Sequence, residues 1–113
     1  MKSKIVSLSK NEDFKSLLKG KRHSNKYFTI FFKKLINKNS KNLNISFITK
    51  KKLGNAVKRN KIKRKLKNMT NDAIKRISIN FNYSYLVIAK NTIFNDDYAN
   101  IKKTLFSNFE RIE

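Results

Sequence analysis

The sequence predicts a single mixed α/β domain whose elements follow the order α, β, β, α, β, α. Three observations support this prediction. Apolar residues recur at helical spacing in the segments 11–20, 55–78 and 95–109, whereas the shorter runs 27–34, 43–47 and 84–90 favour β-strands. The 113 residues suffice for one modest core, and no linker or internal repeat divides them. We therefore expect one domain over residues 1–113.

The first predicted helix follows Ser9. Ser9 and Glu12 have the spacing of a capping box, in which each side chain bonds to backbone at the start of a helix. Apolar side chains at helical spacing then define one face, namely Phe14, Leu17 and Leu18. Gly20 is expected to end this helix as its C-terminal cap.

A strand is predicted over residues 27–34, which read YFTIFFKK. Alternation places Phe28, Ile30 and Phe32 on one face and Thr29 and Phe31 on the other. The polar segment 36–42, INKNSKN, is expected to form a turn. It leads into a second strand, in which Leu43, Ile45 and Phe47 alternate with polar residues. We expect these two strands to form an antiparallel hairpin, with Phe28, Phe32 and Phe47 in the core.

A long amphipathic helix is predicted from Asn55, its N-terminal cap, to about residue 78. Its apolar positions recur at roughly helical spacing: Ala56, Ile62, Leu66, Met69, Ala73, Ile74 and Ile77. The other face, near the N-terminal end, is strongly basic and carries Lys58, Arg59, Lys61, Lys63, Arg64, Lys65 and Lys67. A disordered basic tail would not need the apolar positions.

The remaining two elements are a strand and a helix. Residues 84–90, SYLVIAK, form a short apolar run that suits a buried strand. The last helix is expected to start near Asn95, with Asp96 and Asp97 in its first turn, where the helix dipole favours negative charge. Its apolar stripe consists of Tyr98, Ile101, Leu105 and Phe109.

Charge indicates the class of partner. The formal net charge is +21, and residues 50–67 contain ten Lys or Arg and no carboxylate. Part of this lysine content reflects compositional drift, and a basic run alone is more often a solvated helix face. Its placement on one amphipathic helix nevertheless favours a polyanion such as RNA. A membrane surface is the rival partner, but the chain has no apolar run long enough to span a bilayer and its charge is spread throughout. The N-terminus lacks the features of a secretory signal, so we expect a cytoplasmic location and no membrane partner.

The residue inventory argues against catalysis by the protein itself. The absence of Cys excludes thiolate metal sites and thiol nucleophiles. His23, the only histidine, has no evident acidic or nucleophilic partner and is expected at the surface or in contact with RNA. Two glycines cannot build a phosphate-binding loop, and seven acidic residues show no cluster suited to a metal-dependent nuclease. We expect no catalytic residue in the protein and no organic cofactor.

Residues 51–67, KKLGNAVKRNKIKRKLK, resemble the hallmark motif of the bacterial ribonuclease P protein family, KKxGNAVxRNRxKRxxR. Residues 11–22, NEDFKSLLKGKR, resemble the family's amino-terminal pattern, and the likeness extends over essentially the whole chain. Two arginines of the motif are replaced by Lys61 and Lys67, which keeps the charge but loses the planar bidentate fork. Leu18 stands where the family often has an aromatic residue, which removes one possible stacking platform.

The resemblance implies a two-layer α+β sandwich of order αβββαβα, similar to domain 2 of ribosomal protein S5. Its helices would pack on one face of a mixed sheet, with a left-handed crossover between parallel strands. It also implies that the protein assists an RNA that cleaves the 5′ leader from precursor tRNA with Mg²⁺ held mainly by RNA. The expected partners are this catalytic RNA and precursor tRNA, with no protein partner required.

Two groups of site residues follow from the resemblance. The first would bind the catalytic RNA and comprises Lys51, Lys52, Asn55, Lys58, Arg59, Asn60, Lys61, Lys63, Arg64 and Lys67. The second would bind the single-stranded leader in a cleft between the first helix and the open sheet face, and comprises Phe14, Leu18, Thr29, Phe31, Ile48 and Lys50. No metal ligand is expected, apart from Asn60 as a partner of a metal ion held through water. A different class of protein, a ribosomal or general RNA-binding protein, remains the alternative.

Overall fold

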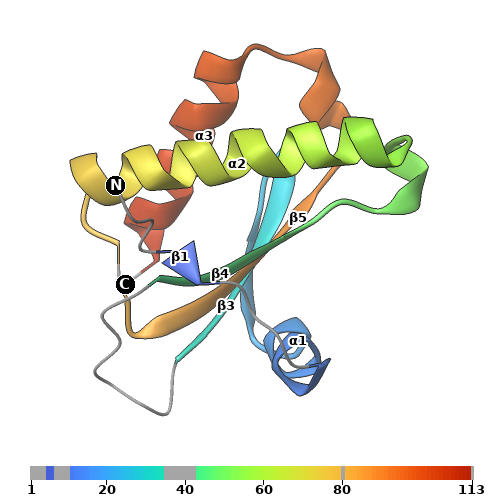
Figure 1. The fold of residues 1–113 in the computed structure, drawn as a ribbon. Helices are drawn as coiled ribbons and strands as arrows, with labels where there is room; N and C mark the ends of the chain where they lie inside the picture. Colours follow the sequence, from blue (N-terminus) through green and yellow to red (C-terminus); the bar gives the residue numbers. More distant parts are fainter. Residues whose placement is uncertain (1–4, 7–10, 35–42, 80, 113) are drawn as a thin grey trace.

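The computed structural model describes residues 5–6, 11–34, 43–79 and 81–112 (Figure 1). Their strands form one mixed sheet in the order β1-β4-β5-β3-β2. The strands are β1 (Ile5–Val6), β2 (Lys21–Ser24), β3 (Phe28–Lys34), β4 (Leu43–Ile48) and β5 (Tyr83–Ala89). β5 pairs in parallel with β4 and antiparallel with β3, while β2 pairs antiparallel with β3 and β1 in parallel with β4.

Helices lie on both faces of this sheet, so the expectation of helices on one face is wrong: Leu17 of α1 packs on Phe31 and Leu86, on the face opposite the main core. α2 (Ala56–Arg76) and α3 (Tyr98–Arg111) cover one face, and α1 (Asn11–Leu18) lies on the opposite side of the strands (Figure 1). Two short 3₁₀ helices, η1 (Lys51–Leu53) and η2 (Asn91–Asn95), precede α2 and α3. The α+β sandwich is thereby confirmed, with the small α1 leaving much of the second sheet face open.

Strand alternation divides the apolar residues between the two faces as predicted. Phe28, Ile30 and Phe32 join the main core beneath α2 and α3, where Leu66, Leu105 and Phe109 pack on them. Phe47 is half-buried against the same core. On the opposite face, Phe31 packs with Leu17 of α1 and Leu86 of β5 in a smaller cluster. The assignment of Phe28, Phe32 and Phe47 to the core is confirmed.

The predicted hairpin between residues 27–34 and 43–47 is wrong, because β5 lies between β3 and β4. Leu86 of β5 is opposite Phe31 on one side and Ser46 on the other. The apolar run of β5 suits this central place, since a central strand is covered on both faces and has both edges paired. The predicted turn at 36–42 lies entirely outside the described residues.

A strand, β2, was absent from the order αββαβα expected from the residues alone. With β2 the order from α1 onward is αβββαβα, as the resemblance implied, and the two-residue β1 precedes it. β2 reads KRHS, so it has no apolar alternation that could reveal it. β2 pairs with β3. Asn25 shapes the turn between these two strands, since its side-chain oxygen accepts hydrogen bonds from the backbone N–H groups of Tyr27 (2.8 Å) and Phe28 (3.0 Å).

Helix ends differ in detail from the prediction. Ser9 of the predicted capping box lies outside the described residues, and α1 begins at Asn11. Gly20 follows α1 in an ordinary backbone conformation, but a Cβ there would lie 2.9 Å from the carbonyl oxygen of Phe32, so close approach to β3 requires the glycine. Asp97 is the N-cap of α3, which places Asp96 and Asp97 just before the helix. Tyr98 is 41% exposed and therefore does not belong to the buried stripe of Ile101, Leu105 and Phe109.

Candidate nucleic-acid interface

A single glycine joins the sheet to the basic helix. Gly54 has a φ of 138°, a conformation that side chains disfavour, and it redirects the chain from η1 into α2. The next residue, Asn55, caps α2, since its side-chain oxygen accepts a hydrogen bond from the backbone N–H of Lys58 (2.9 Å). Leu53 is buried and anchors the junction to the core. The first turn of α2 is thus held at a fixed place beside the sheet.

Nearly all the predicted RNA-binding residues of α2 are exposed. Seven of the ten residues of the first group lie on this helix, and six of those seven are exposed: Lys58, Asn60, Lys61, Lys63, Arg64 and Lys67. Arg59 is half-buried, and its Nε atom is buried without a hydrogen-bond partner in the part of the chain that the structure describes. Lys51, Lys52 and Asn55 are exposed just before the helix.

The N-terminal half of α2 contains no acidic residue of its own. The first acidic residue after Lys50 is Asp72, four turns into the helix. Its carboxylate accepts a hydrogen bond from the Lys102 ammonium of α3, which holds the pKa of Asp72 below its usual value. The charged side chains that the N-terminal half of α2 contributes are therefore all positive, which suits them to neutralising phosphates.

A second basic surface lies on the open face of the sheet. An open hollow of about 580 Å³, here called the sheet groove, is formed by β2, β3, β5 and the segment that follows β4. It is lined by Arg22, Lys26, Thr29, Phe31, Lys50, Lys52, Ile88, Ala89, Lys90, Asn91 and Thr92. The lining contains five basic residues and no acidic one. Cations around a partly apolar floor can hold a nucleic-acid backbone while its bases contact the floor.

The structure brings part of the predicted leader-binding group together in this groove. Thr29, Phe31 and Lys50 line it, and so does Lys52, which the resemblance assigned to the catalytic-RNA group. Phe31 is only 8% exposed because Leu17 and Leu86 cover it, so it supplies floor rather than a free stacking surface. Ile48 is half-buried against the same cluster, whereas Leu18 on α1 is 50% exposed. Phe14 lies in α1, and its side chain is outside the described part of the structure.

Sequence reasoning missed three basic residues of the sheet groove. Arg22 comes from β2, Lys26 from the turn after it, and Lys90 follows the end of β5. The Lys90 ammonium donates to the Ser24 hydroxyl (2.8 Å) and to the backbone carbonyl of Asn25, so its charge is fixed across the β2–β3 turn. Of these three residues, only Lys90 could have been assigned to this sheet face from the sequence, because it continues the alternation of Leu86 and Ile88 on one face.

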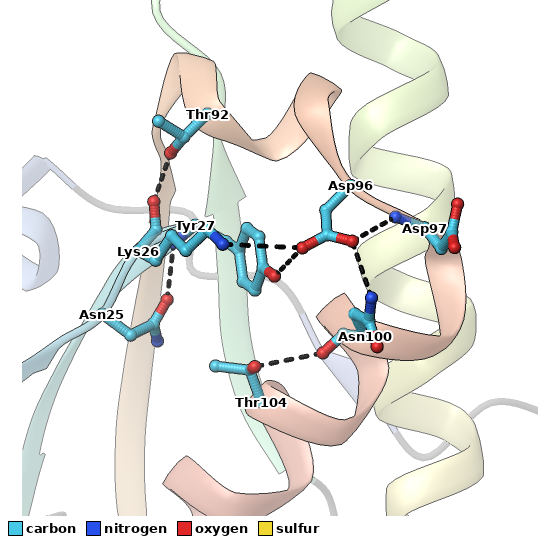
Figure 2. Close-up of polar contacts among 8 residues, drawn as sticks. All are labelled: Asn25, Lys26, Tyr27, Thr92, Asp96, Asp97, Asn100 and Thr104. Carbon is cyan, nitrogen blue, oxygen red and sulfur yellow. Dashed lines mark hydrogen bonds and ion pairs between the residues drawn. The ribbon is translucent and has the colours of Figure 1, made fainter.

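A polar network holds the turn that carries Lys26 (Figure 2). The carboxylate of Asp96 accepts hydrogen bonds from the Tyr27 hydroxyl, from the Asn100 amide (2.7 Å) and from the backbone N–H of Asp97 (2.8 Å). The Lys26 ammonium lies 3.7 Å from the same carboxylate. The hydrogen bonds from Asn100 and Tyr27 are the main cause that lowers the pKa of Asp96 to about 2. Asp96 thereby ties the start of β3 to the start of α3.

The described residues do not fit a metal ion held by the protein. No three His, Cys, Asp or Glu side chains gather anywhere in the described ranges. Asn60 is exposed on α2 between Arg59 and Lys61, a positive surrounding that repels a free divalent cation. No helix in the described part of the chain is long and apolar enough to cross a membrane.

Comparisons with known proteins agree with this geometry. The family model described as Ribonuclease P matches residues 2–113. A curated relative, the ribonuclease P protein component of Mesoplasma florum, is 36% identical over 107 residues, which cover 93% of this chain and 92% of that protein. Among solved structures, the RNase P protein of Thermotoga maritima superposes with a TM-score of 0.80 at 24% identity, covering 96% of this chain and 98% of that one. The Staphylococcus aureus RNase P protein gives a TM-score of 0.74 at 28% identity, covering 94% and 93%.

Proposed function

Because the chain belongs to the ribonuclease P protein family, we propose that it binds the catalytic RNA of that ribonucleoprotein and the 5′ leader of precursor tRNA. In this role it assists hydrolysis that the RNA performs, and the mature 5′ end of tRNA is the product. The observation that carries the proposal is the presence of two basic surfaces, the N-terminal half of α2 and the sheet groove, on one small domain. Such a role belongs in the cytoplasm and needs no protein partner.

The N-terminal half of α2 is proposed to bind the catalytic RNA. Lys63, Arg64 and Lys67 lie at spacings of one to four residues and are exposed, so they can follow a line of phosphates. Six phosphate contacts would give a slope of roughly −4 to −5 in log affinity against log salt concentration. Asn55 contributes by capping α2, which sets the direction in which these charges point.

The sheet groove is proposed to bind the single-stranded leader. Lys50, Lys52 and Lys90 would neutralise leader phosphates, and Phe31 and Ile88 would offer an apolar floor to the bases. Contacts of this kind do not depend on base identity, which suits a leader whose sequence varies between tRNAs. Leu18, exposed on α1, and Phe14 are proposed to add contacts to the leader.

Mg²⁺ is proposed to be held by the RNA. The positive surroundings of Asn60 change once RNA phosphates cover α2, and only then could Asn60 contact the water shell of a metal ion. The protein's own contribution is charge neutralisation, which lowers the concentration of free Mg²⁺ that the RNA needs.

A ribosomal or general RNA-binding protein is the alternative of a different class. The test is cleavage of a precursor tRNA by a bacterial ribonuclease P RNA at low Mg²⁺, with and without this protein. We expect salt-sensitive rescue of cleavage with correct 5′ ends. Absence of rescue with several types of catalytic RNA, together with tight binding to unrelated RNA, would favour the alternative.

A further inference from the structure

A second hollow lies on the opposite side of the molecule, between α2 and the start of α3. This helix groove has a volume of about 300 Å³, at the lower end of the range for small-ligand pockets. Its floor is apolar and includes Ile62 and Leu66 of α2 and Ile101 of α3. Neither the catalytic-RNA surface at Lys63, Arg64 and Lys67 nor the sheet groove includes these floor residues.

The rim of the helix groove is basic. Lys58, Lys61 and Lys65 line it, at successive spacings of three and four residues along one flank of α2. Lys63, Arg64 and Lys67 do not line it, so α2 carries two separate rows of positive charge. The row beside the groove stands over an apolar floor. An anion with an apolar part can contact both the lysines and the floor, whereas a bare phosphate would contact the lysines alone.

One acidic residue, Asp96, also lines the groove, but its acceptor positions are occupied. Its carboxylate interacts with Tyr27, Lys26, Asn100 and the backbone N–H of Asp97 (Figure 2). A carboxylate has about four acceptor sites, so little remains for a ligand. Asp96 therefore serves as part of the groove wall, and the three lysines dominate the local charge.

An aromatic ring completes the groove. Tyr98 lines it and is 41% exposed, in contrast to Ile101, Leu105 and Phe109 on the same helix, which are buried. An exposed ring beside an apolar floor offers a surface on which a base can stack. RNA proteins commonly recognise unpaired bases by stacking them on aromatic side chains while cations hold the backbone.

We propose that the helix groove takes up one unpaired nucleotide of a structured RNA. Its base would lie on the apolar floor against Tyr98, and Lys61 and Lys65 would contact the flanking phosphates. The proposal rests on the RNA-binding function proposed above and deepens it: one flank of α2 binds phosphates alone, and the other selects a nucleotide that has left its helix. Perfectly paired RNA could reach the lysines but could not fill the floor.

The test compares a hairpin RNA that has a single bulged uridine with the same hairpin fully paired. We expect the unchanged protein to bind the bulged RNA roughly five- to a hundredfold more tightly, as expected for one stacked base. Tyr98→Ala should remove this preference, whereas Tyr98→Phe should keep it because the ring remains. Since Tyr98 is 41% exposed, the alanine variant should stay folded. A photoreactive 4-thiouridine at the bulge should crosslink to Tyr98.

The lysine rim is tested separately by Lys61→Gln, with Lys75→Gln at the far end of α2 as the matched control. Lys61→Gln should reduce the magnitude of the salt slope by about 1 for both RNAs and leave their affinity ratio unchanged. Lys75→Gln should change neither the salt slope nor the affinity ratio. Equal affinity of the unchanged protein for both hairpins, or equal losses for both from Tyr98→Ala, would overturn the nucleotide site. Rescue of precursor cleavage by the same preparation would then show that the proposed function survives without it.

Discussion

At the scale of single residues, the hydrogen bond between Tyr27 and Asp96 makes the stability of the fold decrease both in acid and in alkali. The Asp96 pKa is lowered to about 2, so its ionised form stabilises the fold fully above the ordinary value near 4. This contribution is lost as the pH falls from about 4 to about 2. The pKa of Tyr27 is raised, chiefly by its hydrogen bond to Asp96. The contribution of the neutral phenol is therefore present below pH 10 and lost above it.

Replacement of Asp96 should reveal this acid dependence. We expect Asp96→Asn to be less stable than the unchanged protein at pH 6 and to lose less stability between pH 4 and pH 2, as measured by urea denaturation. Asp97→Asn is the matched control, since the Asp97 side chain makes no capping hydrogen bond to α3. Equal acid dependence in the unchanged protein and in Asp96→Asn would contradict the assignment.

At the scale of elements, the two proposed RNA surfaces can be separated by charge-removing variants. Lys52→Gln, in the sheet groove, should weaken binding to precursor tRNA with a leader and lower the salt slope of that interaction by about 1. Arg64→Gln, on α2, should do the same for the catalytic RNA and leave leader binding nearly unchanged. Affinities measured by filter binding across a salt series provide the comparison. Equal losses for both ligands from both variants would mean that one surface binds both RNAs.

The elements also show how far sequence reasoning extends. The position of α2 could be predicted because Asn55 caps it and apolar residues recur at its own period. β2 could not, since the edge strand KRHS buries little and has no apolar pattern. The prediction that β3 pairs with β4 was wrong. It rested on their proximity in sequence, which favours a hairpin, whereas β5, buried on both faces, lies between them. Arg22 enters the sheet groove only through the pairing of β2 with β3, which no local pattern predicts.

At the scale of the whole molecule, the net charge of +21 opposes the folded state. Ion pairs such as those of Lys26 with Asp96 and of Lys102 with Asp72 offset a small part of it. An anion that binds the folded protein alone should stabilise it by mass action, by about 2.7 kcal/mol at a hundred times its dissociation constant.

Phosphate should therefore raise both the helicity and the thermal midpoint of the free protein. Circular dichroism across a millimolar phosphate titration measures both, with sodium chloride at equal ionic strength as the control for screening. We expect a larger effect from phosphate than from chloride. An unchanged spectrum and an unchanged thermal midpoint throughout the titration would contradict stabilisation by phosphate.

The central place of β5 has a consequence for biosynthesis. β3 and β4 each pair with β5 and are not paired with each other in the described structure, so the sheet cannot close until residues 83–89 have left the ribosome. The basic segment that becomes α2 emerges before that strand, while β3 is paired only with β2 and its other edge still lacks a neighbour. Non-local pairing of this kind is slow and leaves apolar surface open to aggregation. The nascent chain should thus depend on chaperones, or on the polyanionic ribosome surface, until its last quarter is made.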